Sequence, residues 1–401
     1  MPDSADVYKA GALAARLEHT GSGVRFSYHD EYLDGPGPAV ASTLPRSSEP
    51  VLTPAGAVPA FFAGLLPEGR RLQALRRAVK TSADDELSLL VAVGSDTVGD
   101  VQVVASGSTP AGDRSGLVLA DPAGLRFEDL LHDAGVADRP TLAGVQDKAS
   151  AAMLSLPVRR RGERFILKLD PTEFPHLVRN EAYFAARARA ARIPAVTTRV
   201  LTDVDARPGL LVTRFDRVAE ADGTVRLIAV EDAAQAAGAW PADKYRLSFE
   251  EAASALMGLT RAPRVAASRL VEQLAFAWLT GNGDQHAKNL SVYERDPGEF
   301  MVTPAYDLPS TLFYGDQTLA LTVAGKDTLT ARRFMEAAAT LELTPRSARR
   351  TLAAALRATA DLAESIEAGA LPFDRRTNAK TARTLRGRHR ELADGMSRID
   401  E

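Results

Sequence analysis

Short apolar and alternating runs separated by turn residues fill the first hundred positions of the chain. Residues 24–28 alternate between apolar and polar side chains as a half-buried strand does, and residues 59–66 and 85–93 predict two short helices. A turn-rich run then leads into an apolar strand at residues 101–105. We therefore expect a small mixed domain of helices and strands over residues 1–105.

A second unit is predicted over residues 126–230, after a segment rich in Gly, Ser, Pro and Asp at residues 106–125 that indicates a linker. Residues 179–191 predict a helix that ends before Pro194, because a residue preceding proline is disfavoured in helical conformation. Strand-like runs occupy residues 151–156, 165–169 and 209–213.

The third unit, residues 231–401, is predicted to be mostly helical. Residues 270–279 are nearly all apolar and indicate a buried helix that ends at a Gly-Asn-Gly turn. Segments rich in Ala, Leu and Arg at residues 329–341 and 345–368 predict further helices. The last thirty residues are basic and fit either a solvated amphipathic helix or a nucleic-acid-binding surface.

Composition narrows the class of protein. The 401 residues carry a formal net charge of −3, so no global charge favours nucleic acid or an anionic membrane. Cysteine is absent, which excludes disulfides and thiolate metal sites, and the six histidines are scattered. The apolar runs predict no membrane span and the N-terminus no secretory signal, so we expect a cytoplasmic protein.

Polar chemistry is concentrated directly after the apolar run of residues 270–279. Asp284, Asn289 and Asp307 supply two carboxylates and an amide oxygen, which can hold a hydroxyl nucleophile and Mg²⁺ against a nucleoside triphosphate. In protein kinases a metal-binding Asn follows the catalytic Asp by five residues and a second metal-binding Asp comes later. The order and the spacing from Asp284 to Asn289 agree, although a turn that merely caps helices would use the same residue types.

Two cations and a histidine accompany these oxygens. His286 fits a structural hydrogen-bonding role better than that of a base, and Lys288 either stabilises a transferred phosphoryl group or lies in solvent. Lys168 follows the apolar run Phe-Ile-Leu as the phosphate-binding lysine of kinases does, and Glu181 on the next helix is its expected partner. The alternative is that Lys168 and Glu181 are exposed and unrelated.

A phosphate-binding loop is expected just before the strand-like run at residues 151–156. The candidate loop departs from Gly-x-Gly-x-x-Gly, yet one glycine, successive backbone N–H groups and a lysine suit phosphate oxygens. Its residues are Ala143, Gly144, Val145, Gln146, Asp147 and Lys148. Together with the strand-rich and helical units, the motifs predict an α+β fold with two lobes like those of protein kinases.

The chain resembles the HipA family of serine/threonine kinase toxins from bacterial toxin–antitoxin modules, over nearly its whole length. The motifs that carry the resemblance are residues 61–67, 94–99, 143–148, 165–168, 180–181, 214–217, 231–235, 283–291 and 304–307. Their order along the chain matches that of the family. The resemblance implies a HipA-like fold with an added N-terminal domain and a kinase that uses ATP and Mg²⁺.

The resemblance also implies roles for individual residues. Asp284 would be the catalytic base, Asn289 and Asp307 the metal ligands, and Lys168 a ligand of the ATP phosphates. The nucleotide would also contact residues 143–148, Thr213, Arg214, Phe215, His286, Lys288 and Tyr306. Thr213 departs from the acidic residue common at its position. Thr141 stands where family members autophosphorylate a serine.

The implied partners are a protein substrate, of the kind of an aminoacyl-tRNA synthetase, and a small helix-turn-helix antitoxin of HipB type, through which DNA is contacted indirectly. Two rival functions stay open. The Asp-x-His-x-x-Asn loop also resembles loops of small-molecule and lipid kinases, and a non-catalytic co-repressor could retain the same fold.

Overall fold

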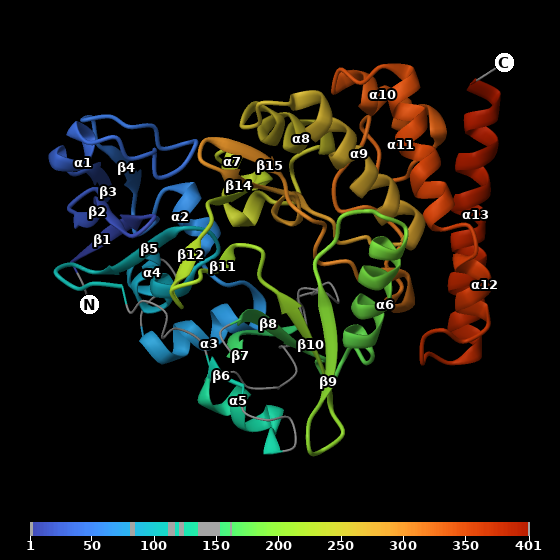
Figure 1. The fold of residues 1–401 in the computed structure, drawn as a ribbon, viewed down its shortest axis with the longest axis horizontal. Helices are drawn as coiled ribbons and strands as arrows, with labels where there is room; N and C mark the ends of the chain where they lie inside the picture. Colours follow the sequence, from blue (N-terminus) through green and yellow to red (C-terminus); the bar gives the residue numbers. More distant parts are fainter. Residues whose placement is uncertain are drawn as a thin grey trace.

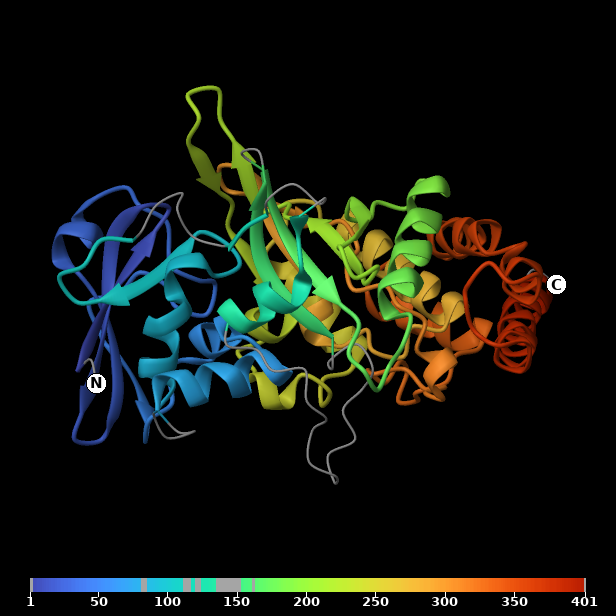
Figure 2. The ribbon, with the colours of Figure 1, turned by 90° about the horizontal axis from the view of Figure 1, so that it is seen from below.

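The computed structural model describes residues 3–80, 85–110, 117–119, 124–134, 153–160 and 163–399. Its N-terminal strands and C-terminal helices lie at opposite ends of the molecule, with a second sheet between them (Figures 1 and 2). Among the described helices, none combines the length and apolar character needed to cross a bilayer.

The first sheet is antiparallel, with five strands in the order β4-β3-β2-β1-β5. The strands are β1 (Ser4–Lys9), β2 (Ala12–Thr20), β3 (Gly23–Tyr28), β4 (Val51–Pro54) and β5 (Val101–Ala105). The accompanying helices are α1 (Asp30–Asp34), α2 (Ala60–Leu65), α3 (Gly69–Val79) and α4 (Glu86–Val93). The predicted helices at residues 59–66 and 85–93 are confirmed, because their apolar side chains fill one core with β3.

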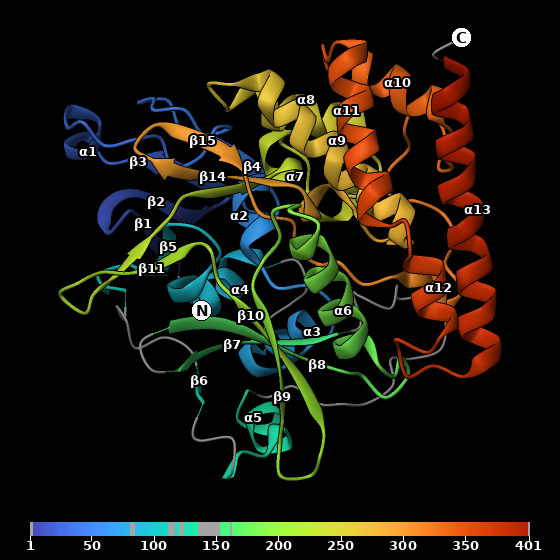
Figure 3. The same cartoon turned by 45° about the vertical axis from the view of Figure 1, so that its right-hand side comes forward.

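The second sheet has the order β6-β7-β8-β10-β9. Its strands are β6 (Leu117–Val118), β7 (Leu154–Arg160), β8 (Glu163–Leu169), β9 (Thr198–Thr202) and β10 (Pro208–Thr213). Residues 106–125, predicted as a linker, contribute β6, which pairs in parallel with β7. Helix α5 (Phe127–Asp133) packs on this sheet, and α6 (Leu177–Ala190) lies beside β9 and β10 (Figure 3).

The remaining part is dominated by helices, as expected, but it also contains short strands. The helices are α7 (Ala233–Ala236), α8 (Phe249–Gly258), α9 (Pro263–Thr280), α10 (Ala331–Thr340), α11 (Pro345–Ala358), α12 (Leu362–Glu367) and α13 (Arg375–Ile399). The strands are β11 (Arg217–Ala219), β12 (Val225–Leu227), β13 (Val230–Asp232), β14 (Ser291–Asp296) and β15 (Glu299–Val302). The segment 345–368 is two helices, because the chain leaves helical conformation between Ala358 and Leu362.

Helix α9 is the buried helix that the apolar run predicts, and its end fixes the polar loop that follows. Gly281 caps the helix with φ +76°, a left-handed conformation that glycine adopts readily. A Cβ at this position would lie 2.3 Å from Leu312 Cδ1, so a side chain is excluded sterically as well. This cap therefore fixes the direction in which the chain leaves α9 at Asn282.

The basic C-terminal run forms α13, an amphipathic helix that buries Ala382, Leu385 and Leu392. One of its arginines, Arg388, is also buried. Its guanidinium carbon lies 3.7 Å from the ring centroid of Trp278, and Nη1 donates to the Trp278 carbonyl at 2.9 Å. Burial lowers the pKa of Arg388 to about 10. This basic residue therefore serves packing between α13 and α9.

Candidate active site

A cavity of about 320 Å³ lies where the second sheet, the N-terminal domain and the helical part of the chain meet. Of the predicted site residues, its lining includes Lys168, Thr213, Arg214, Phe215, Lys288, Tyr306 and Asp307. The N-terminal domain contributes Arg71 and residues 64–68. Residues that are far apart in the sequence thus form one concave site of the size that small ligands occupy.

Lys168 is the centre of a buried charge cluster. It extends from β8, and its Nζ donates to Glu181 Oε1 at 2.8 Å and Oε2 at 3.0 Å on α6. The same Nζ forms an ion pair with Asp307 Oδ1. Burial opposes the lysine's charge, but the two carboxylates outweigh it and raise the pKa of Lys168 above its ordinary value. The structure thus excludes the alternative in which Lys168 and Glu181 are exposed and unrelated.

The backbone of Asp307 is held in an uncommon conformation. Its φ is +52°, a left-handed value that L-residues other than Asn and Asp adopt rarely. Asn282 Nδ2 donates to the Asp307 carbonyl at 2.8 Å, which ties this turn to the loop after α9. The strained turn is stabilised by that loop and aims the Asp307 carboxylate at Lys168.

The loop after α9 presents Asp284, a buried carboxylate, beside Asn289. The Asp284 N–H donates to Asn282 Oδ1 at 3.0 Å, and Asn289 Nδ2 donates to the Asp284 carbonyl at 2.9 Å. The hydroxyl of Tyr245 donates to Asp284 Oδ1 at 3.1 Å. The first two bonds hold the backbone of the turn, and the Tyr245 bond orients the Asp284 carboxylate.

The donor set suits a magnesium ion shared with phosphate oxygens. The amide nitrogen of Asn289 is used in its bond to Asp284, so Oδ1 is the atom free to act as a ligand. Asp307 adds a carboxylate, and Mg²⁺ is usually held by one or two such oxygens plus phosphates and water. No cluster of three or more His, Cys, Asp or Glu that could hold a metal ion occurs among the described residues. Asn289 Oδ1 and the Asp307 carboxylate are two oxygen donors that could hold such an ion.

His286 is buried and Lys288 is partly buried, and both contact neighbouring elements. Burial holds the pKa of His286 well below its ordinary value, so the imidazole is neutral, and its ring lies edge-on to Tyr245 at 5.2 Å. Lys288 is not in solvent: its Nζ donates to the Gly64 carbonyl at 2.7 Å and lies 3.4 Å from Glu68 Oε1. Lys288 therefore contacts the N-terminal domain rather than bulk water.

Thr213 and Phe215, which the resemblance implies as nucleotide contacts beside the adenine, are found at and just past the end of β10. Thr213 is the last residue of that strand and pairs with Phe165, and the ring of Phe215 lies 5.9 Å from that of Tyr306. Tyr306 donates from its hydroxyl to the Lys288 carbonyl at 2.8 Å. Burial raises the pKa of Tyr306, so its hydroxyl stays protonated. The wall they form is largely apolar, as a purine ring requires.

Arg214 itself points into a buried ion-pair network that the sequence alone did not reveal. Its Nη2 donates to Asp216 Oδ2 at 2.7 Å and Nη1 to Asp96 Oδ1 at 2.7 Å. Asp216 also accepts from Arg217 Nη1 at 2.8 Å and from the Gly99 N–H at 3.0 Å. The two motifs at residues 94–99 and 214–217 therefore contact each other and join the N-terminal domain to the end of β10.

The ionisation of Asp216 should make the free energy of unfolding depend on pH in the acid range. Burial opposes its charge, but Arg214 and Arg217 outweigh it and lower the pKa of Asp216 to about 2. A carboxyl whose folded pKa lies below its unfolded value of about 3.9 stabilises above that value, and the contribution is lost as pH falls toward the folded pKa. We expect about 2–3 kcal/mol of stability to disappear between about pH 4 and about pH 2. Acid titration of the free energy of unfolding should show a flatter curve over this window for Asp216→Asn.

Several predictions fall on residues outside the described ranges. These are the phosphate loop, residues 143–148, and Thr141. Conversely, sequence reasoning missed Glu68, Tyr245 and Asp216 as site neighbours. Glu68 follows the motif at residues 61–67 directly, and that adjacency was the one available signal.

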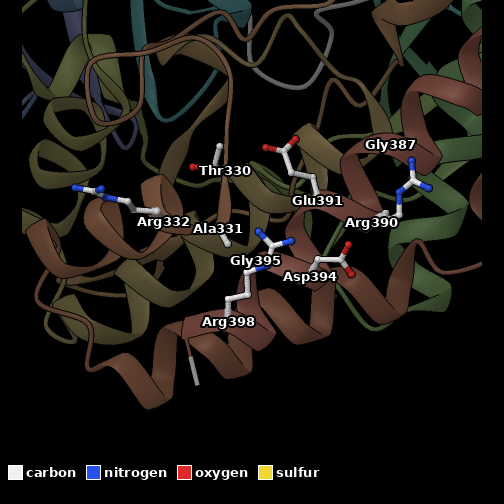
Figure 4. A pocket seen from close by; sticks show the side chains of 9 residues that line it. All are labelled: Thr330, Ala331, Arg332, Gly387, Arg390, Glu391, Asp394, Gly395 and Arg398. Carbon is white, nitrogen blue, oxygen red and sulfur yellow. The ribbon is translucent and has the colours of Figure 1, made fainter. Parts of the chain in front are cut away.

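A separate hollow of about 480 Å³ lies between the start of α10 and the C-terminal half of α13 (Figure 4). Its lining consists of Thr330, Ala331, Arg332, Gly387, Arg390, Glu391, Asp394, Gly395 and Arg398. None of the predicted site residues lies in it. Its mixed arginines and carboxylates define no catalytic set, so the cavity around Lys168 remains the candidate active site.

Comparisons with known proteins show the family to which the chain belongs. Residues 5–104 match the HipA N-terminal domain, and residues 140–363 match the HipA-like C-terminal domain. The chain therefore belongs to the HipA family, which confirms the resemblance stated from its motifs. The α+β, kinase-like fold is confirmed too, because the structure superposes on Shewanella oneidensis HipA, solved with HipB and operator DNA, with a TM-score of 0.78. That match has 20% identity and covers 98% of this chain and 99% of that one.

Relatives in sequence carry kinase names. The Sinorhizobium fredii protein named "Putative kinase Y4mE" is 31% identical over 73% of this chain and 73% of its own length. A second protein of that organism, "Putative kinase Y4dM", is 34% identical over 66% of this chain and 65% of its own. The serine/threonine-protein kinase toxin HipA of Shewanella oneidensis is 28% identical over 66% of each.

Proposed function

We propose that this protein is an ATP- and Mg²⁺-dependent kinase that phosphorylates a serine or threonine of a protein target. One observation carries the proposal: Lys168 and Asp307 line one cavity, and Lys168 pairs there with Asp307 and behind it with the buried Glu181. Asn282 ties the Asp307 turn to the loop that holds Asp284 and Asn289. A strand lysine, a helix glutamate and a later aspartate in this arrangement are the working parts of phosphoryl transfer in kinases.

In the proposed reaction the acceptor hydroxyl attacks the γ-phosphorus of ATP. Its oxygen forms the new P–O bond as the bond to the ADP oxygen breaks, and Asp284 accepts the hydroxyl proton. Lys168 binds phosphate oxygens and offsets the negative charge that moves toward ADP. Asn289 and Asp307 would hold Mg²⁺, which would supply positive charge to offset that of the phosphate groups. Tyr245 keeps the Asp284 carboxylate in place.

The biological setting is inferred from relatives. Because HipA of Shewanella oneidensis was solved with HipB and operator DNA, we infer that this chain pairs with a small antitoxin of HipB type and contacts DNA through it. We infer further that it acts in the cytoplasm as a growth-arresting toxin, with an aminoacyl-tRNA synthetase as the first target class to test. Thr141 is the proposed autophosphorylation site.

A transfer assay tests the chemistry. Purified protein is incubated with γ-labelled ATP, Mg²⁺ and cell lysate, and the products are separated into protein and small-molecule fractions. We expect a labelled protein band with the wild type and loss of label with Asp284→Asn, which removes the proton acceptor but keeps the size of the side chain. Label found only on small molecules would favour a small-molecule kinase, and nucleotide binding without transfer would favour a non-catalytic co-repressor.

A further inference from the structure

The N-terminal domain reaches the catalytic loop through the segment that ends α2. Gly64, the fifth residue of α2, offers its carbonyl to Lys288 Nζ at 2.7 Å. A Cβ on Gly64 would lie 2.8 Å from Gln235 Cγ, so only glycine fits against α7 without displacing that side chain. Gln235 Nε2 in turn donates to the Phe61 carbonyl at 2.9 Å. This close packing brings the next polar residue, Glu68, into the cavity.

Glu68 is paired with two lysines of the catalytic part of the chain. Its Oε2 forms an ion pair with Lys244 Nζ, and its Oε1 lies 3.4 Å from Lys288 Nζ. The lysine side chains are only 10% and 12% exposed, so these charges are weakly screened. Burial opposes the glutamate's charge, but the two lysines prevail and lower the pKa of Glu68. Glu68 is therefore ionised at neutral pH, and its pairing with Lys244 and Lys288 is called the clamp below.

Both lysines are adjacent in sequence to residues that belong to the proposed phosphoryl-transfer site or contact it. Lys288 immediately precedes Asn289, the proposed metal ligand. Lys244 accepts a bond from the Ala287 N–H through its own carbonyl at 3.2 Å. It also precedes Tyr245, whose hydroxyl donates to Asp284 Oδ1 at 3.1 Å. The Glu68 carboxylate of the N-terminal domain is thus linked to the loop of Asp284 and Asn289 at two points, through Lys244 and through Lys288.

We propose that Glu68 is a positioning residue of the phosphoryl-transfer site, supplied by the N-terminal domain and acting through Lys244 and Lys288 on Asp284 and Asn289. The inference rests on the proposed kinase function and assigns the N-terminal domain a part in it. Docking of that domain then sets the geometry of the loop. A loop misplaced by about 1 Å is enough to cost about 10²-fold in rate.

The closing experiment compares two charge-removing variants in the full-length protein. Glu68→Gln keeps the side-chain size and removes the clamp. Glu173→Gln is the matched control, because Glu173 also pairs across the domains, with Arg70 at 2.6 Å, and its side chain is 30% exposed against 33% for Glu68. The described hydrogen bonds between Arg70 and Glu173 lie outside the loop of Asp284 and Asn289.

We expect kcat to fall by about 10- to 100-fold in Glu68→Gln, with KM for ATP changed by less than about threefold. Glu173→Gln should stay within about twofold of wild type in kcat. The fold-loss of kcat in the double variant Glu68→Gln/Lys288→Gln should be smaller than the product of the two single losses, because both substitutions remove the Glu68–Lys288 pair. Equal losses of kcat in Glu68→Gln and Glu173→Gln would show a general docking effect and overturn the positioning role, as would wild-type kcat in Glu68→Gln.

Amide hydrogen exchange separates this inference from the kinase proposal. Peptides spanning residues 284–289 should exchange faster in Glu68→Gln than in wild type or Glu173→Gln, whether or not the protein transfers phosphate. If the wild type is inactive but exchange is faster in Glu68→Gln, the kinase function is contradicted and the positioning role of Glu68 is supported. Unchanged exchange in Glu68→Gln would overturn the positioning role of Glu68.

Discussion

Replacing Asp307 by asparagine should abolish phosphoryl transfer, with kcat lower by on the order of 10³-fold and the fold retained. The substitution exchanges the carboxylate for a neutral amide of the same shape. It removes the charged oxygen that, with Asn289, fits Mg²⁺, and it also removes one of the two carboxylates around Lys168. Glu181 still pairs with Lys168 at 2.8 Å, so the buried lysine keeps a counter-charge and the protein should remain folded.

Steady-state transfer rates measured against Mg²⁺ concentration check this expectation. The affinity for ATP should become nearly independent of Mg²⁺ in Asp307→Asn, whereas wild type should bind ATP more tightly with the metal present. Asp296→Asn is the control, because that carboxylate is 56% exposed on β14 and pairs only with its neighbour Arg295 in the described contacts. Wild-type kcat in Asp307→Asn would show that this residue is not a metal ligand.

The parts of the fold that sequence reasoning recovered are those dictated by local pattern. Helices α2 and α4 and the C-terminal part of α9 follow continuous apolar runs, and β5 follows a turn-rich segment, so each of these is specified within a dozen residues. The strands β13 to β15 were missed, because runs of three to six residues with mixed polarity carry no period. Their pairing is decided by partners elsewhere in the chain.

The site residues also fall into two groups, those that a local motif identified and those that only the fold brings together. Lys168 and Asp307 were singled out because each stands in a motif of recognisable spacing, and the structure brings them into one ion pair although 139 positions separate them. Glu68 is separated from Lys244 by 176 positions, and no spacing connects the two. Asp216 has arginines beside it in the sequence, but its contact with Gly99 spans 117 positions. Contacts between domains of this kind require the fold before they can be recognised.

The largest effect on stability is expected at Asp216. Asp216→Asn should lower the free energy of unfolding by about 3–5 kcal/mol, because removing one partner of a buried ion pair leaves charges without compensation. Arg214 and Arg217 both donate to this carboxylate and are each nearly buried, at 5% and 4% side-chain exposure. Asp96 remains in contact with both arginines at 2.7 and 3.2 Å, which keeps the loss from being larger.

Denaturant unfolding followed by fluorescence and circular dichroism measures this loss. Glu220→Gln is the matched control. Glu220 follows β11, which begins directly after Asp216, and it pairs with Arg226 at 2.7 Å, but both side chains are exposed, so its loss should stay below about 1 kcal/mol. Because the Asp216 network joins the N-terminal domain to the end of β10, limited proteolysis should also cleave Asp216→Asn between these parts sooner than wild type. Equal stability of Asp216→Asn and Glu220→Gln would mean that the buried network does not hold the domains together.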